Sequence, residues 1–159
     1  MITILQNLEP IRVEKSSYLV EELDEMNMVI FFEKGKYKIG YSVNREEIYK
    51  LQYDGVNMIG AYAVSFNKRA LFIYRTITLC EGYFVRKTKW KEIFQDQDFA
   101  EITDKMRAQL KKEYIANVKE PLMKSKIKEV QKIAQRADYD TILSLQGIIQ
   151  NKKIKQVEE

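Results

Sequence analysis

The chain has 159 residues, of which 45% are hydrophobic and 31% charged, and its formal net charge at pH 7 is +4. This length accommodates one domain with a substantial core and excludes two large ones. The sequence contains no histidine, which excludes Ser-His and Cys-His nucleophile pairs and the common zinc sites. We therefore expect a protein that is not an enzyme and that holds no metal.

The start of the chain and its hydropathy indicate where the protein resides. No segment approaches the run of ~20 apolar residues that a membrane-spanning helix needs. Met1 is followed by ITILQNLEP, which has neither the basic start nor the apolar length of a secretory signal. The single cysteine, Cys80, has no partner for an intrachain disulfide. These features predict a cytosolic chain in which Cys80 is a small buried side chain of a strand.

The first two thirds of the chain are predicted to form β-strands. Segments rich in β-branched and aromatic residues, as strands require, cover residues 11–15, 28–43, 46–53 and 70–79. In the stretch KYKIGY the tyrosines and Ile39 alternate with Lys36 and Lys38, so one face should point inward and the lysines outward. EKGK is expected to make a hairpin turn in which Gly35 supplies a positive φ. Short strands with close turns favour a jelly roll or barrel.

A helical period replaces this pattern after Trp90. Apolar residues recur every three or four positions along one predicted helix face, at Phe99, Ile102, Met106, Leu110, Tyr114 and Val118. Pro121 is expected to interrupt that helix, because proline lacks a backbone donor and disfavours a helical Glu120. A second helix is predicted from Met123, Ile127, Val130, Ala134 and Ala137, and a short third one, broken near Gly147, from Ile142, Leu145 and Ile148.

Strands followed by helices predict an α+β fold, an antiparallel β-roll (jelly roll) with C-terminal α-helices. We assign residues 1–95 to the β-roll domain and residues 96–145 to helices that pack on the roll or extend from it. Residues 146–159 are expected to be a polar, frayed tail.

Two segments suggest chemistry of their own, and each has a plainer explanation. Asp138 and Asp140 could be an acid–base pair, but two acids near a predicted helix start are more commonly caps and solvated charges.

The segment GYFVRKTKWK combines aromatic and basic residues. Its aromatic residues Tyr83, Phe84 and Trp90 interleave with Arg86, Lys87, Lys89 and Lys91, as in platforms that stack single-stranded nucleic acid. A strand that leads into an amphipathic helix explains the segment equally simply. We adopt that alternative and expect no nucleic-acid partner, because acidic residues are interspersed through most of the sequence.

The order of these segments resembles the cyclic nucleotide-binding domain. ILQNLEPI looks like the end of that family's leading helix, and EELDEMNMVIFFEKGKYKIG is similar to its second and third strands. GVNMIGAYAVSFNKRA is similar to its phosphate-binding cassette, while EGYFVRKTKW and the helix after it resemble the last strand and first C-terminal helix. The resemblance rests on the order of the segments.

Within this family, GYFVRKTKW and the DYDTIL tail resemble the C-terminal cytoplasmic region of tetrameric voltage-gated and cyclic-nucleotide-gated cation channels. That resemblance implies a regulatory domain of a cation (potassium) channel, which couples cAMP, cGMP or an intrinsic ligand to gating and has no cofactor. It implies partners in the remainder of the channel and in neighbouring subunits of a homotetramer. It also implies that the chain is a piece of a membrane protein, cytoplasmic and soluble as a fragment, because its leading helix is cut short at Met1.

The resemblance further implies a set of ligand-binding residues. Gly60 matches the glycine that lets the backbone approach the phosphate, Arg69 the arginine that grips two phosphate oxygens, and Ala70 the small residue beside it. Ala61 departs from the family, which usually has an acid there that accepts a hydrogen bond from the ribose. Losing that bond costs on the order of 1.5 to 3 kcal/mol, or roughly tenfold to more than a hundredfold in affinity. Tyr62 or Ser65 could supply the missing hydrogen-bond acceptor.

Several alternatives stay open at this point. Gly60 and Arg69 could form a plain turn with a solvated arginine, and Arg75 is a rival cation within an alternating strand. The pocket could have kept its fold while binding nucleotide weakly or not at all, or Tyr139, Ile142 or Leu143 of the chain itself could fill it. The chain could also be a non-channel interaction or scaffold module with the same β-roll, in which the lysine-rich helix from Lys119 to Lys132 meets an acidic partner or the inner leaflet of a membrane.

Overall fold

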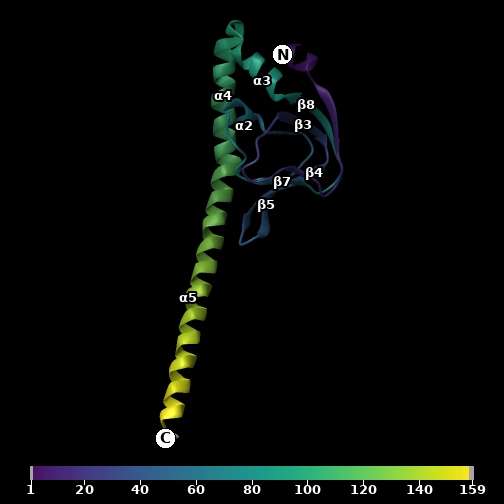
Figure 1. Ribbon diagram of the computed structural model, residues 1–159. Coiled ribbons are helices and arrows are strands. Elements are labelled where there is room, and N and C mark those ends of the chain that lie inside the picture. The colour runs from purple at the N-terminus through teal and green to yellow at the C-terminus, as the bar shows by residue number, and fades with distance from the viewer. Residues whose placement is uncertain (1, 158–159) are drawn as a thin grey trace. The chain divides into compact units, whose positions relative to one another are not determined.

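The computed structural model describes the backbone of residues 2–157 and the side chains of residues 4–148. Two compact units divide at Met123, the first comprising Met1–Met123 and the second Lys124–Glu159. Figure 1 shows the ribbon with its elements labelled. The strands and the first four helices belong to the first unit.

Two antiparallel sheets of four strands each make up the roll. One sheet has the order β1 (Glu9–Val13), β8 (Cys80–Arg86), β3 (Met28–Lys34), β6 (Asn57–Ile59). The other has the order β2 (Tyr18–Val20), β7 (Ile73–Thr76), β4 (Lys36–Val43), β5 (Glu46–Asp54). In both sheets, strands from distant parts of the sequence are neighbours, as in a jelly roll. The predicted fold class, an antiparallel β-roll followed by helices, is confirmed.

The turn predicted at Gly35 is the β3–β4 connection, but it is not the predicted hairpin, because β3 and β4 belong to different sheets and do not pair with each other. Gly35 has a φ of 111°, in the region that glycine tolerates and other residues avoid. In β4 the side chains of Tyr37, Ile39 and Tyr41 are buried while Lys36 is exposed, so the predicted alternation is confirmed. The three-residue strands β2 and β6 were not predicted, because so short a segment shows no alternation.

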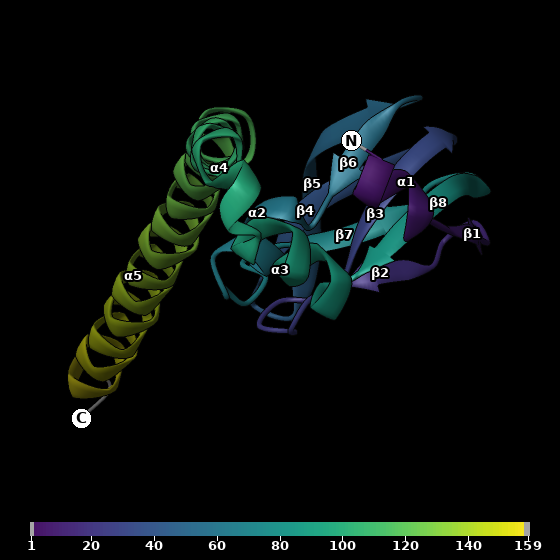
Figure 2. The ribbon, with the colours of Figure 1, turned by 90° about the horizontal axis from the view of Figure 1, so that it is seen from above.

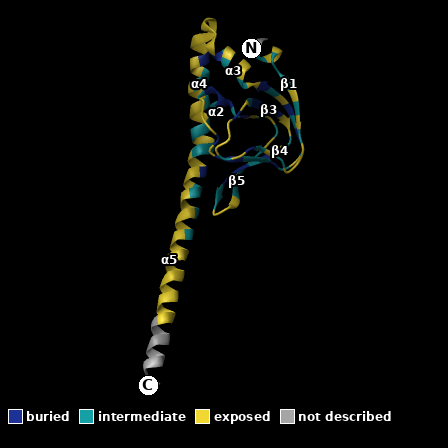
Figure 3. Cartoon of the chain, viewed as in Figure 1, coloured by how far each residue is buried: buried dark blue, intermediate teal, exposed yellow. Residues whose placement is uncertain are grey.

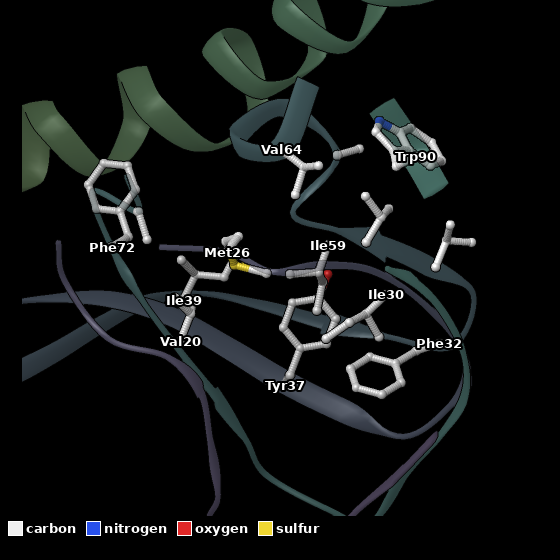
Figure 4. Packing of buried hydrophobic residues seen from close by; sticks show 14 of the residues in the cluster. Val20, Met26, Ile30, Phe32, Tyr37, Ile39, Ile59, Val64, Phe72 and Trp90 are labelled. Atoms are coloured by element: carbon white, nitrogen blue, oxygen red, sulfur yellow. The ribbon is translucent and has the colours of Figure 1, made fainter. Parts of the chain in front are cut away.

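The hydrophobic core fills the roll and extends to the helices beside it. Its buried side chains include Val20, Met26, Ile30, Phe32, Tyr37, Ile39, Ile59, Val64, Phe72 and Trp90, seen together in Figure 4. Cys80 is fully buried in β8, as predicted. Burial of apolar surface at about 25 cal/mol per Å² is the main stabilisation available to such a roll.

Helices α2 (Ala61–Ser65), α3 (Lys87–Gln95) and α4 (Ala100–Tyr114) pack against one another beside the sheets (Figure 2). Helix α1 (Ile2–Gln6) precedes β1, and the 3₁₀ turn η1 (Gln97–Phe99) joins α3 to α4. The segment GYFVRKTKWK is strand β8 running into α3, as in the alternative we adopted. Its Trp90 is buried, Arg86 pairs with Glu9, and Lys87 pairs with Glu25.

The predicted apolar face of α4 is correct in its second half and wrong in its first. Met106, Leu110, Tyr114 and Val118 pack against the core. Phe99 and Ile102, however, are 47% and 58% exposed. Phe99 lies in η1, before α4 begins. Ile102 lies one residue before the buried Thr103, which turns it roughly 100° away around the helix.

Pro121 does not interrupt the helix, which corrects the prediction. Helix α4 continues through a π turn, η2 (Ile115–Lys119), into α5 (Glu120–Val157), with Pro121 as its second residue. Proline cannot give the carbonyl of Asn117 an α-helical hydrogen bond, but the Tyr53 hydroxyl donates to that oxygen at 3.5 Å. The wider π turn also keeps Leu122, which is fully buried, on the core side.

The second unit is the remainder of α5, described by itself. The helix runs through Gly147 without a break, so the predicted second and third helices are one. Asp138 and Asp140 are exposed within it, far from a helix start, which rules out a capping role. Residues 124–148 are mostly exposed (Figure 3). The tail predicted to fray over residues 146–159 is instead helical as far as Val157, and residues 158 and 159 lie outside the described residues.

The described residues contain neither a membrane-spanning helix nor a cluster of metal ligands. No helix among residues 2–157 is long and apolar enough to cross a membrane. In the same part of the chain, acidic and cysteine side chains form no group of three that could hold a metal ion.

Candidate functional site

The predicted cassette is a strand, a glycine and a short helix. β6 ends at Ile59, and Gly60 has a φ of 85° immediately before α2. A Cβ atom at Gly60 would lie 2.6 Å from Met26 Cε and 3.0 Å from the carbonyl oxygen of Met28. The positive φ therefore favours glycine at this position, and a Cβ atom would also crowd the carbonyl oxygen of Met28.

A pocket of about 320 Å³ lies where the roll and α2 meet α4 and η2. This volume is within the range of small-molecule sites, roughly 300–1,000 Å³. Tyrosines dominate its wall, contributed by three strands and two helices: Tyr37, Tyr53, Tyr62, Tyr74 and Tyr114. A flat aromatic ligand would therefore find stacking surfaces on several sides.

The tyrosine rings contact one another. Tyr62 of α2 and Tyr114 of α4 stack with ring centroids 4.2 Å apart and an interplanar angle of 9°. Within the roll, Tyr37 stacks on Tyr53 at 5.5 Å and on Tyr74 at 6.4 Å. Such pairs contribute about 0.5–1.5 kcal/mol beyond the burial of their area, so the Tyr62–Tyr114 pair helps to hold α4 against α2.

Burial changes the titration of three of these tyrosines. Burial raises the pKa of Tyr114 to about 12, with a smaller contribution from the neighbouring Tyr62. Burial likewise raises the pKa values of Tyr37 and Tyr74 well above the usual range. These three hydroxyls are therefore uncharged at neutral pH and can both donate and accept hydrogen bonds.

Arg69 and Glu113 bring opposite charges to this lining. Arg69 is exposed, and its Nη1 donates a 2.9 Å hydrogen bond to the carbonyl oxygen of Leu23. The remaining guanidinium donors are sufficient for an anion. Glu113 on α4 accepts a 2.6 Å hydrogen bond from Gln109. The pocket thus has a cation on the roll and a carboxylate on the helix.

The structure brings all four predicted cassette residues to this one pocket: Gly60, Ala61, Arg69 and Ala70. Tyr62 lines it as well. Ser65 does not, because its buried hydroxyl accepts a 2.8 Å hydrogen bond from Trp90 Nε1. The rival Arg75 donates to the carbonyl oxygen of Ser16 and forms a 3.6 Å ion pair with Glu47, away from the lining.

Sequence reasoning missed the pocket residues outside the cassette. Tyr53, Tyr74, Glu113 and Asn117 were not candidates, and Tyr114 was predicted only as a packing residue. The available signal was the alternation within strands, which places tyrosines on the inward face as it does in β4. That signal does not tell an inward tyrosine of the core from one at the edge of a cavity.

No protein-family model and no curated protein sequence matches the chain. Solved structures do match its fold. The regulatory domain of Toxoplasma gondii PKA with cAMP has 15% identity, covers 58% of this chain and 35% of that chain, and gives a TM-score of 0.54. The sensor domain of the transcriptional regulator DNR from Pseudomonas aeruginosa has 11% identity, coverages of 74% and 79%, and a TM-score of 0.58.

A third similar structure is the C-linker/CNBHD of zELK channels, crystallized in the presence of cAMP. It has 10% identity, covers 69% of this chain and 54% of that chain, and gives a TM-score of 0.58. The chain has the fold of the cyclic nucleotide-binding domains. The resemblance inferred from the order of segments is thereby confirmed for the cyclic nucleotide-binding fold. The chain spans about a third of the first structure and about half of the third, 35% and 54%.

Proposed function

We propose that the chain is a non-catalytic regulatory domain whose tyrosine-lined pocket takes a cyclic nucleotide, cAMP or cGMP, with weakened affinity. The observation that carries this proposal is the convergence of Gly60, Ala61, Arg69 and Ala70 on one pocket of about 320 Å³. The Arg69 guanidinium supplies the cation for a cyclic phosphate, and the tyrosine rings supply stacking surfaces for a purine.

The weakened affinity for a cyclic nucleotide follows from Ala61. Its side chain is a buried methyl group on the pocket wall, and it can accept no hydrogen bond from a ribose hydroxyl. Ser65, one of two predicted substitutes, is engaged by Trp90. Tyr62 remains at the pocket, but its ring is stacked on Tyr114. A site that lacks this charged acceptor should bind a nucleotide roughly tenfold to more than a hundredfold more weakly.

For the parent protein we propose a cation (potassium) channel, in which this cytoplasmic domain would couple its ligand to gating within a homotetramer. The resemblance of GYFVRKTKW and DYDTIL supports this context, and one of the three similar structures comes from a channel. Residues 1–95 would then bind the ligand, and residues 96–145 would transmit its effect. An interaction or scaffold module with the same β-roll is the alternative.

An intrinsic ligand is the second candidate for the pocket. Tyr139, Ile142 and Leu143 are exposed on α5, so their side chains are not needed for packing within the second unit. A tyrosine ring from this segment would present the same flat surface as a purine. It would compete with added nucleotide by mass action.

Isothermal titration of the full chain with cAMP and cGMP tests the proposal. We expect binding weaker than low-micromolar that is lost in Arg69→Ala and kept in Arg12→Ala, an exposed arginine on β1 that lies outside the pocket lining. Low-micromolar binding by the unmodified chain would contradict the weakened site. Equal binding by Arg69→Ala, or none at millimolar nucleotide, would contradict the nucleotide site.

A further inference from the structure

Helix α5 carries an apolar stripe that is exposed to solvent. Ile127, Val130, Ala134 and Ala137 recur at spacings of three, four and three residues, the period of a coiled-coil seam. Ile127 and Val130 are 52% and 49% exposed. An isolated helix surrounded by water gains little from its own propensity and needs a packed face for stability.

Charges on this part of α5 are segregated along its length. Cations come first, at Lys124, Lys126, Lys128, Lys132 and Arg136, and the carboxylates Asp138 and Asp140 follow. Glu129 is the exception, and it pairs with Lys132 at 3.3 Å on the same helix. A helix with one basic and one acidic end is complementary to a copy of itself that runs in the opposite direction.

We propose that this stripe is the interface with a second copy of the chain, which packs antiparallel along residues 124–140. With residue 132 at the crossing point, Ile127 faces the partner's Ala137 and Val130 faces the partner's Ala134. Each large side chain then meets a small one, which allows close packing without voids. The same register sets Lys124 and Lys126 beside the partner's Asp138 and Asp140.

A parallel arrangement would provide neither the packing of large side chains on small ones nor the pairing of opposite charges. It would stack Ala134 on the partner's Ala134 and so leave space between the helices around that layer. It would also bring the basic ends of both helices to the same level, where like charges repel. The ion pairs therefore determine whether the two helices pack parallel or antiparallel, and the apolar layers supply the attraction between them.

Sedimentation of the full chain over a range of concentrations tests the interface. We expect a dimer whose dissociation constant rises at least tenfold in Asp138→Lys/Asp140→Lys and in Lys124→Asp/Lys126→Asp. Combining all four substitutions in one chain should restore dimerisation, because the basic and acidic positions then exchange places and opposite charges again lie side by side. The control Glu14→Lys/Glu33→Lys changes the charge equally at exposed positions of the roll and should leave the dimer intact. A chain that stays monomeric at every concentration would overturn the proposal.

The direction of packing needs a second measurement. In a Cys80→Ala background, spin labels placed at Gln131→Cys flank the stripe next to the crossing point and should be close together. Labels at Leu145→Cys, which flank the same stripe, lie 26 residues apart in the antiparallel register, an axial separation of about 39 Å at 1.5 Å per residue. Short distances at both positions would indicate a parallel pair and would overturn the antiparallel interface.

Discussion

Ala61 sets the chemistry of the pocket wall next to Gly60. Its methyl group is nearly fully buried and lines the cavity. The residue therefore contributes packing where the resemblance to nucleotide-binding domains implies a hydrogen-bond acceptor. A single side chain can account for the difference between a strong site and a weak one, because one charged hydrogen bond contributes about 1.5–3 kcal/mol.

Ala61→Glu is predicted to increase the affinity for cAMP or cGMP about tenfold to a hundredfold, because the new carboxylate can accept a hydrogen bond from the ribose. Isothermal titration measures the change. Ala61→Gln is the matched control: it has the same length without the charge, so its gain should be smaller. Equal affinity for the nucleotide in the unmodified chain, Ala61→Glu and Ala61→Gln would mean that the ribose does not lie near residue 61.

At the scale of the element, the helix that closes the pocket depends on the π turn. Regular α-helical geometry through residues 115–119 would rotate the residues that follow, since a π turn holds more residues per turn. Leu122 is fully buried, whereas the next residue, Met123, is 39% exposed. The π turn thus decides which of the two neighbours packs in the core.

Leu122→Ala is predicted to lower the free energy of unfolding by about 2–5 kcal/mol, the usual cost of deleting a buried leucine side chain. Met123→Ala is the matched control and should cost well under half as much, because its side chain remains partly in water. Urea denaturation followed by circular dichroism measures both. Similar losses in the two variants would mean that the helix does not present the face described above.

At the scale of the molecule, the tyrosine wall links stability to alkaline pH. Burial raises the pKa of Tyr114 in the folded chain to about 12, above the ordinary tyrosine value of about 10. The unfolded chain therefore releases this proton at lower pH than the folded chain does. The stabilisation is fully present below about pH 10 and is lost as the pH rises from 10 through 12.

We predict that the urea midpoint of the full chain falls between pH 10 and pH 12. It should fall less steeply in Tyr114→Phe, which has no hydroxyl to ionise. Tyr139→Phe, a change at an exposed position of α5, should follow the unmodified chain. A fall of equal steepness in all three proteins would show that Tyr114 ionises as readily in the folded chain as in the unfolded one.

Several features of the fold follow from short-range pattern alone. The alternation in KYKIGY predicted the buried Tyr37 and Ile39 of β4, and the turn before it predicted the positive φ of Gly35. The spacing of Met106, Leu110, Tyr114 and Val118 predicted the packed face of the helix. The order of segments was sufficient to indicate the cyclic nucleotide-binding fold. The inferences about β4, Gly35 and the helix face depend on residues only a few positions apart, whose side-chain directions are fixed by the local backbone.

Only the tertiary structure decided the composition of the pocket and the course of the helix. It joined Tyr53 and Tyr74 of the roll to Tyr62 and Tyr114 of the helices, and it turned Ser65 toward Trp90. It also let the helix pass Pro121 without a break. The amino-acid sequence by itself determined the longer strands, the turn at Gly35 and the packed second half of the helix face, because these depend on neighbouring residues. The pocket depends on contacts between residues far apart in the chain, and no local period encodes which of them meet.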